Sequence, residues 1–331
     1  MRITHLMAAV ATAATLAAPS AQAQLRSITI GTNPSGSAFY LIGGGLAKLY
    51  QEKLKIRSTA QPYAGSSVYL PLINSGEVTL GLASTVDSGL AYKGQAGFND
   101  KNAKLRTLGQ VWIIPYAFIT RADSGIKTAE DLKGKRIMGD MPTSQALTLI
   151  NQAIVESGGL SISDVEFMRS GGLMDGIAAV VEGRADVAPA ATSMPALAKS
   201  NASVPGGLRV IANGSQGSDE FFSQRIGGVG TSVAKPNDKR PYIVGDTPVV
   251  SYATMVVTNV GMSEDDAYKL TKTMHENWAQ LQKDYGPMRS VAANEVPLAK
   301  PSVPYHPGAI RYYKEAGLWS DAHAAAQAAF K

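Results

Sequence analysis

The hydrophobic and polar positions of the chain follow one arrangement twice. A short β-branched run, a loop of Gly, Pro and Ser, and apolar positions at helical spacing make up residues 27–50, and the same order returns over residues 136–157. Two pairs of residues stay in register about 108 positions apart: Gly31 with Gly139, and Pro34 with Pro142. Each unit therefore predicts a strand, a loop and a helix.

Two later segments extend the repeat. Residues 65–68 match residues 172–175, and residues 73–83 match residues 180–190. A repeat of this length is typical of a duplicated domain, so we expect two similar lobes with a ligand held between them. Strands that alternate with helices favour an α/β fold with parallel sheets and helical crossovers.

The boundaries of several elements can be predicted. We expect strands at 56–60, 78–83, 136–139, 165–168 and 184–190, and helices at 68–74, 145–157, 173–182, 263–285, 309–316 and 321–330. Ser67 would cap the helix at 68–74, which places Pro71 in its first turn, where a missing N–H is tolerated. Residues 201–249 are rich in Gly, Ser, Pro and Asn, and they indicate no clear order of elements.

Two apolar extended runs, 108–120 and 249–259, are candidates for segments that cross between the lobes. We therefore expect residues 24–115 and 255–331 to form lobe 1, and residues 116–254 to form lobe 2.

The first residues predict a signal peptide. Arg2 precedes an apolar stretch of about 13 residues, and the small-residue triplet Ala21-Gln22-Ala23 follows it. A spanning helix needs roughly 20 apolar residues, so a membrane anchor is the weaker interpretation. We expect residues 1–23 to be cleaved and the chain to reach the periplasm without being embedded in a membrane.

Composition narrows the classes of partner. The 331 residues include no Cys, so neither a disulfide nor a lipid-anchoring cysteine exists. The formal net charge is +5, but the basic residues are scattered rather than interleaved with aromatic residues, which argues against a nucleic-acid partner.

The loops before the helices carry the candidate binding residues. Free N–H groups and the positive end of a helix dipole suit a carboxylate, and such loops lie at the carboxyl ends of the strands. The alternative is that these residues are ordinary caps. The candidates from these loops are Thr32, Ser35, Gly36, Ser37, Gly65, Ser66, Thr143, Ser144 and Gln145.

Three charged residues near the same loops have two interpretations each. Ser84 and Asp87 form a Ser-x-x-Asp pattern that fits a capping box, and Asp87 could equally accept an amine. Asp140 has the same ambiguity, and Arg169 could pair with a carboxylate or lie in solvent.

Catalytic and metal sites are hard to assemble from this sequence. After the signal peptide the only histidines are His275, His306 and His323, and their spacing does not suit a metal. No nucleophile-elbow, Walker or dinucleotide motif is present. We expect no catalytic residue, no metal and no cofactor, although an enzyme that relies on Asp87 or Asp140 is a remaining alternative.

The chain resembles the TAXI family of solute receptors, which serve tripartite ATP-independent periplasmic (TRAP) transporters. The resemblance covers essentially the whole chain after the signal peptide. It is carried by residues 30–40, 73–78, 131–137 and 304–317, of which the last are the most specific.

The resemblance implies a type II periplasmic binding-protein fold and a small carboxylate ligand, of the class of glutamate or 2-oxoglutarate. It implies delivery of that ligand to membrane permease subunits; a sensor that docks on a membrane receptor is the alternative. Carried over position by position, it adds Tyr40, Thr85 and Pro142 to the binding residues. The loop at 139–144 lacks the Gly-Ser-Gly character usual in the family.

Overall fold

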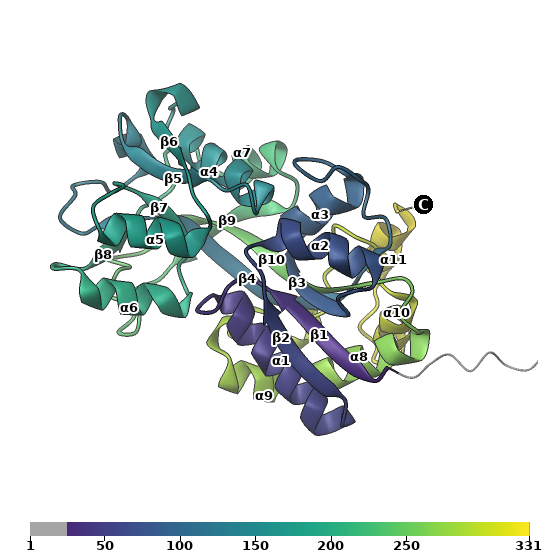
Figure 1. The fold of residues 1–331 in the computed structure, drawn as a ribbon. Helices are drawn as coiled ribbons and strands as arrows, with labels where there is room; N and C mark the ends of the chain where they lie inside the picture. Colours follow the sequence, from purple (N-terminus) through teal and green to yellow (C-terminus); the bar gives the residue numbers. More distant parts are fainter. Residues whose placement is uncertain (1–24, 331) are drawn as a thin grey trace, which may run out of the picture.

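The computed structural model describes residues 25–330 of the chain, so the expected signal peptide lies outside the described residues. Two long antiparallel strands, β4 (Leu105–Arg121) and β10 (Thr247–Asn259), connect the two halves of the molecule. Both strands run from one half into the other (Figure 1). The apolar runs predicted to cross between lobes are these strands.

The first lobe is built on three parallel strands beside β10. They are β1 (Ser27–Thr32), β2 (Arg57–Pro62) and β3 (Leu80–Ser84), and β1 lies between the other two. The helices that follow them are α1 (Ala38–Leu54), α2 (Ser66–Ser75) and α3 (Thr85–Lys93). The C-terminal helices return to this lobe: α8 (Glu264–Glu276), α9 (Trp278–Asp284), α10 (Pro307–Glu315) and α11 (Asp321–Ala328).

The second lobe contains the strands β5 (Arg136–Asp140), β6 (Glu166–Arg169), β7 (Ala188–Ala191), β8 (Leu208–Val210) and β9 (Val229–Ala234). Its helices are α4 (Gln145–Ser157), α5 (Leu173–Val181), α6 (Pro195–Ser203) and α7 (Asp219–Arg225). The segment from 201 to 249, which had no readable order, supplies β8, α7 and β9. These elements are short, which is why their periodicity is weak.

The prediction of parallel sheets is only partly right. Within the described residues, one 8-stranded sheet follows the order β2-β1-β3-β10-β4-β7, with β8 on β4 and β9 on β10. The strands β10, β4, β7, β8 and β9 pair antiparallel. In the described part of the second lobe, parallel pairing is limited to β5 with β6 and to two isolated bridges, Ile137 with Val187 and Thr128 with Ala212. The antiparallel pairing follows from the two crossing strands, because β4 enters the second lobe and β10 leaves it.

Two helix predictions need correction. The helix α2 begins at Ser66 with Gly65 as its N-cap, so Pro71 lies inside the helix and not in its first turn. An earlier start is possible because the N–H of Ser67 donates to the carbonyl of Thr143 in the other lobe, at 3.2 Å. The predicted helix 263–285 is divided at Asn277, whose ψ of 18° is not helical, into α8 and α9.

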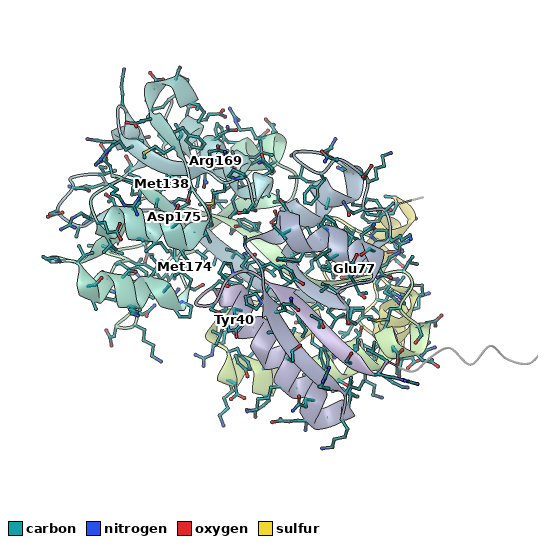
Figure 2. The ribbon with its side chains drawn as sticks, viewed as in Figure 1. Tyr40, Glu77, Met138, Arg169, Met174 and Asp175 are labelled. Carbon is teal, nitrogen blue, oxygen red and sulfur yellow. The ribbon has the colours of Figure 1, made fainter. Side chains whose placement is uncertain are left out.

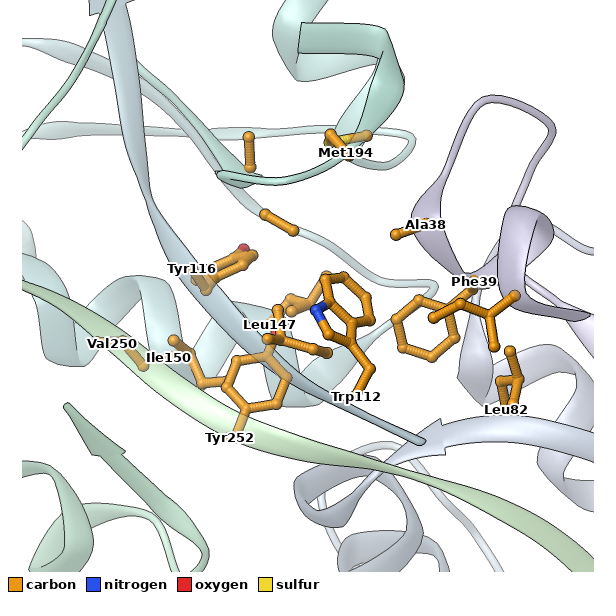
Figure 3. Packing of buried hydrophobic residues seen from close by; sticks show 14 of the residues in the cluster. Ala38, Phe39, Leu82, Trp112, Tyr116, Leu147, Ile150, Met194, Val250 and Tyr252 are labelled. Atoms are coloured by element: carbon orange, nitrogen blue, oxygen red, sulfur yellow. The ribbon is translucent and has the colours of Figure 1, made fainter. Parts of the chain in front are cut away.

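A band of aromatic residues occupies the junction of the lobes (Figure 3). Phe39 of α1 meets Trp112 of β4 edge to face, with ring centroids 5.8 Å apart. The ring centroids of Tyr116 in β4 and Tyr252 in β10 lie 5.9 Å apart. The predicted lobe boundaries at 115/116 and 254/255 fall inside β4 and β10, and they stay a prediction. Across residues 25–330, no helix is long and apolar enough to cross a membrane.

Candidate binding site

Two adjoining cavities lie between the lobes. The inner cavity has a volume of about 30 Å³ and the outer one about 240 Å³. Residues of both lobes line each cavity. The lining residues that they share are Asn33, Ser37, Ser144, Leu147, Leu173 and Met194.

The helices α1, α2, α4 and α5 all begin at the outer cavity. The N-caps of α1 and α4 are Ser37 and Ser144, and those of α2 and α5 are Gly65 and Gly172. All four N-caps line this cavity. The pairing follows the sequence repeat, since the segment beginning at Gly65 corresponds to the one beginning at Gly172. Backbone N–H groups and four positive helix ends therefore face one space, which suits an oxyanion.

Glycine is required at the N-caps of α2 and α5 for different reasons. A Cβ on Gly65 would lie 2.3 Å from the carbonyl oxygen of Thr143, so only glycine allows this approach of the lobes. Gly172 has a φ of +151°, which side chains rarely adopt, and its Cβ position lies 3.8 Å from the carbonyl oxygen of Ala64 in the first lobe.

Hydrogen bonds join the lobes at the inner cavity, which Asp87 and Ser144 both line. Ser144 Oγ donates to Asp87 Oδ1 at 3.0 Å, and Ser66 Oγ donates to Ser144 Oγ at 3.4 Å. With the bond from Ser67 to Thr143, these contacts bring the N-termini of α2 and α4 together. The described conformation is therefore one in which the lobes touch.

Among the described residues that line the inner cavity, Asp87 is the one charged residue. It is 5% exposed and lines the inner cavity. The predicted capping box is present only in part. Ser84 Oγ caps α3 by accepting from the N–H of Asp87 at 2.9 Å, but the carboxylate of Asp87 accepts from Ser84 Oγ, at 2.6 Å, and not from the backbone N–H of Ser84. Burial raises the pKa of Asp87, although hydrogen bonds from Ser84, Ser66 and Ser144 act in the opposite direction. Asp87 therefore takes part in the N-cap hydrogen bonds of α3 and lines the cavity at the same time.

Tyrosines surround Asp87 without supplying a positive charge. Tyr69 OH donates to the carbonyl of Leu82, and Tyr116 OH donates to Asn151 Oδ1 at 2.9 Å. Burial, and then the charge of Asp87, raise the pKa values of Tyr69 and Tyr116. These phenols are neutral donors at ordinary pH.

The lining residues include two carboxylates, Asp87 in the inner cavity and Asp175 in the outer one, and no Lys, Arg or His in the described part of the chain. Asp175 is exposed, and its Oδ2 accepts from the N–H of Gly171 at 2.9 Å. Arg169 is exposed on β6 and lines neither cavity. Figure 2 shows Arg169, Met174 and Asp175 on the second lobe, and Tyr40 on the first.

The structure brings six of the predicted site residues to the cavities: Ser37, Gly65, Ser84, Asp87, Thr143 and Ser144. Ser66 lies directly behind them, through its bond to Ser144. Thr32 and Thr85 are buried and donate to carbonyl groups, Thr32 to Gln61 at 3.2 Å and Thr85 to Ala253 at 3.4 Å.

The other predicted residues line neither cavity. Ser35, Gly36 and Tyr40 are exposed, and Pro142 and Gln145 are half-buried. Sequence reasoning missed a further set of lining residues. Asn33 lies in the predicted loop and could have been included. Phe39 of α1 and the aromatic residues of the crossing strands, Trp112, Tyr116 and Tyr252, had sequence patterns that indicate only a buried core.

The three histidines in the described part of the chain have structural roles away from the two cavities. His306 is the N-cap of α10, and its Nδ1 accepts from the N–H of Gly308 at 3.2 Å. Burial lowers the pKa of His306. His275 contacts Tyr312 OH at 2.8 Å, and His323 contacts the carbonyl of Pro297 at 2.9 Å. Over residues 25–330, no group of three or more His, Cys, Asp and Glu side chains is placed to hold a metal ion.

Comparison with known proteins identifies the fold. PhnD1 from Prochlorococcus marinus, solved in complex with methylphosphonate, is similar at 11% identity and a TM-score of 0.53, over 80% of this chain and 90% of that chain. An ancestral arginine-binding protein bound to arginine has 16% identity and a TM-score of 0.51, over 79% of this chain and 97% of that chain. The α/β fold of type II periplasmic binding proteins, which the sequence analysis predicted, is confirmed.

A further similar structure is an ABC transporter periplasmic binding protein from Brucella ovis with glutathione bound. Its identity is 12% and its TM-score 0.50, over 79% of this chain and 70% of that chain. At the level of sequence, the model of the NMT1-like family matches residues 30–317.

Proposed function

Because the chain belongs to the NMT1-like family, we propose that it is a solute-binding protein of a transport system, which captures a small carboxylate-bearing solute between its lobes. The observation that carries this proposal is the convergence of the N-termini of α1, α2, α4 and α5 on one cavity of about 240 Å³. A carboxylate placed there accepts hydrogen bonds from backbone N–H groups of both lobes.

The same arrangement gives a mechanism for capture. A solute that contacts both lobes stabilises the closed conformation more than the open one, so binding shifts the population toward closure. The contacts of Ser144 with Asp87 and of Ser67 with Thr143 form only when the lobes meet. A membrane partner that recognises surfaces of both lobes can thereby distinguish the loaded receptor from the empty one.

We propose further that the partner is the membrane permease of a TRAP transporter and that the protein acts in the periplasm. The support is the resemblance to the TAXI family in residues 30–40 and 304–317. Residues 30–40 supply the N-cap and first turn of α1 at the cavity. Residues 304–317 form α10 with its histidine cap, which packs against α8.

Mass spectrometry of the solute released by denaturing the purified protein tests the capture of a small solute. Isothermal titration of the emptied protein with amino acids and dicarboxylates then tests the class. We expect a released small molecule and a member of the panel that binds at one site per chain. A protein that releases nothing and binds no small solute would overturn the proposed function.

The transport partner is tested separately, by uptake of the identified solute into vesicles that contain the candidate TRAP permease subunits. We expect uptake only when the receptor is added. Uptake that is equally fast without the receptor would contradict the partner while leaving solute capture intact.

A further inference from the structure

We propose that Asp87 is the acceptor for an ammonium group of the solute, so that the receptor selects amine-bearing solutes over keto acids and dicarboxylates of the same shape. This inference rests on the proposed function, because it concerns the same cavities. It adds the requirement that the solute carries a positive charge, which the helix N-termini alone do not impose.

The first step is the charge balance around Asp87. Its carboxylate is 5% exposed, and its oxygens accept from the hydroxyls of Ser84 at 2.6 Å and Ser144 at 3.0 Å. Hydroxyl donors satisfy hydrogen bonds but carry no positive charge. An ionised carboxylate buried without a cation is strongly unfavourable, so such groups pair with one or become protonated.

The second step is that the protein offers no such cation. Among the described residues that line the two cavities there is no Lys, Arg or His. The titratable groups that face Asp87 are Tyr69 on α2, Tyr116 on β4 and Tyr252 on β10, and burial raises the pKa of each. They stay neutral, so a cation that pairs with ionised Asp87 is one that the solute supplies.

The third step is the size and lining of the inner cavity. Its volume of about 30 Å³ exceeds the roughly 10–15 Å³ that one water requires, so an ammonium group fits in it. Phe39, Trp112, Tyr116 and Tyr252 line the same cavity. Aromatic rings attract a cation over their faces, which strengthens the selection of an ammonium.

The fourth step places the rest of the solute. A carboxylate of a zwitterion reaches the helix N-termini at the outer cavity, where Ser37 and Ser144 cap α1 and α4. A second carboxylate would find no cation there, and Asp175 lines the same cavity. The site therefore suits a monocarboxylate with an amine and disfavours a dianion.

Matched pairs of solutes test this assignment, because the members of each pair differ only in an amine or a keto group. The probes are L-leucine with 4-methyl-2-oxopentanoate, and L-glutamate with 2-oxoglutarate, titrated into emptied wild-type protein and into Asp87→Asn. We expect the better-binding amino acid to bind the wild type at least about tenfold more tightly than its keto acid, since charged hydrogen bonds are the strong ones. In Asp87→Asn this preference should fall below about threefold.

The exposed Asp246 provides a matched control, since Asp246→Asn removes a carboxylate from the second lobe away from both cavities. We expect it to keep the wild-type preference. Circular dichroism of each variant establishes that it folds. Should Asp87→Asn fail to fold, the wild type alone decides, because its affinity for the amino acid should fall as the pH is lowered and Asp87 takes up a proton.

Three results would overturn the assignment of Asp87. They are equal affinities for the amino acid and the keto acid of each pair, a preference for the amino acid that survives in Asp87→Asn, and an affinity for the amino acid that does not change with pH. The assignment would also be overturned if the protein bound a solute without an amine and bound no solute that carries one. The proposed function would stand in that case. Absence of binding to any small solute is a different result, because it removes the proposed function itself.

Discussion

Ser144, the N-cap of α4 in the second lobe, donates its hydroxyl to Asp87 of α3 in the first lobe at 3.0 Å. Most N-cap serines accept a hydrogen bond from their own helix, but the side chain of Ser144 makes no such bond. Its hydroxyl is used between the lobes instead. The hydroxyl of Ser144 therefore couples the closure of the two lobes to the ionisation of the buried carboxylate of Asp87.

The first prediction concerns the stability of the empty protein. Burial raises the pKa of Asp87 above its usual value of 3.8, so the contribution of this group to folding is fully present below about pH 4 and is lost as the pH rises. Asp87→Asn removes the buried charge and should raise the free energy of unfolding by about 1 kcal/mol at pH 7. The gain should shrink toward zero near pH 4. Urea unfolding at both pH values measures it, and a variant less stable than wild type at pH 7 would contradict the account.

The second prediction concerns closure. A Cβ at residue 65 would lie 2.3 Å from the carbonyl oxygen of Thr143, so Gly65→Ala should hold the lobes apart and weaken solute affinity by tenfold or more. Small-angle X-ray scattering should show a larger radius of gyration with solute present than for the wild type. Gly44→Ala is the control, because nothing lies within 4 Å of its Cβ and helical glycine is unfavourable, so we expect unchanged affinity and a gain of about 1 kcal/mol.

The third prediction separates a helix cap from a binding contact. Ser37 Oγ accepts from the N–H of Tyr40 at 3.1 Å, and Ser263 Oγ accepts from the N–H of Asp266 at 3.0 Å in α8, away from the cavities. Replacing either serine by alanine should lower the free energy of unfolding by about 1 kcal/mol. Only Ser37→Ala should also weaken solute binding, because only Ser37 lines the cavities. Parallel titration and thermal unfolding compare the two variants; equal losses of affinity would show that the cap acts through stability alone.

The fourth prediction uses fluorescence. Of the three tryptophans, Trp112 lines the inner cavity, whereas Trp278 donates to the carbonyl of Val291 and Trp319 packs on Tyr305. Solute binding should therefore change the emission of Trp112 and leave the other two nearly constant. We expect the change to disappear in Trp112→Phe and to persist in Trp319→Phe. A change of wild-type size in Trp112→Phe would place its source elsewhere.

The repeat in the sequence predicted many of the helices and loops that surround the cavities. The helix at residues 145–157 was predicted with the bounds that the structure gives it, and the matched glycines at 65 and 172 are both N-caps at one cavity. These features are local: a cap, a loop and an apolar face are each determined by neighbouring residues.

The aromatic residues that line the inner cavity from the crossing strands were not predictable in the same way. Trp112, Tyr116 and Tyr252 lie in apolar strands, where a side chain that faces a cleft and one that faces a core give the same pattern. The antiparallel pairing of β4 with β10 depends on residues far apart in the chain, and no local signal reports it. The dual role of Asp87 likewise depends on Ser144, which lies in the other lobe.

The return of the chain to the first lobe has a consequence for how the protein folds. The strand β3 completes its pairing only with β10, through contacts such as Leu82 with Val256, and α1 packs against α8. The lobe that begins first along the chain is thus the last to be finished, since more than 150 residues separate β3 from β10. Pairing over such distances is slow, and the unfinished first lobe exposes a strand edge until the C-terminal part arrives. A chain that must stay unfolded for a time after synthesis, as an exported one does, would gain from this delay.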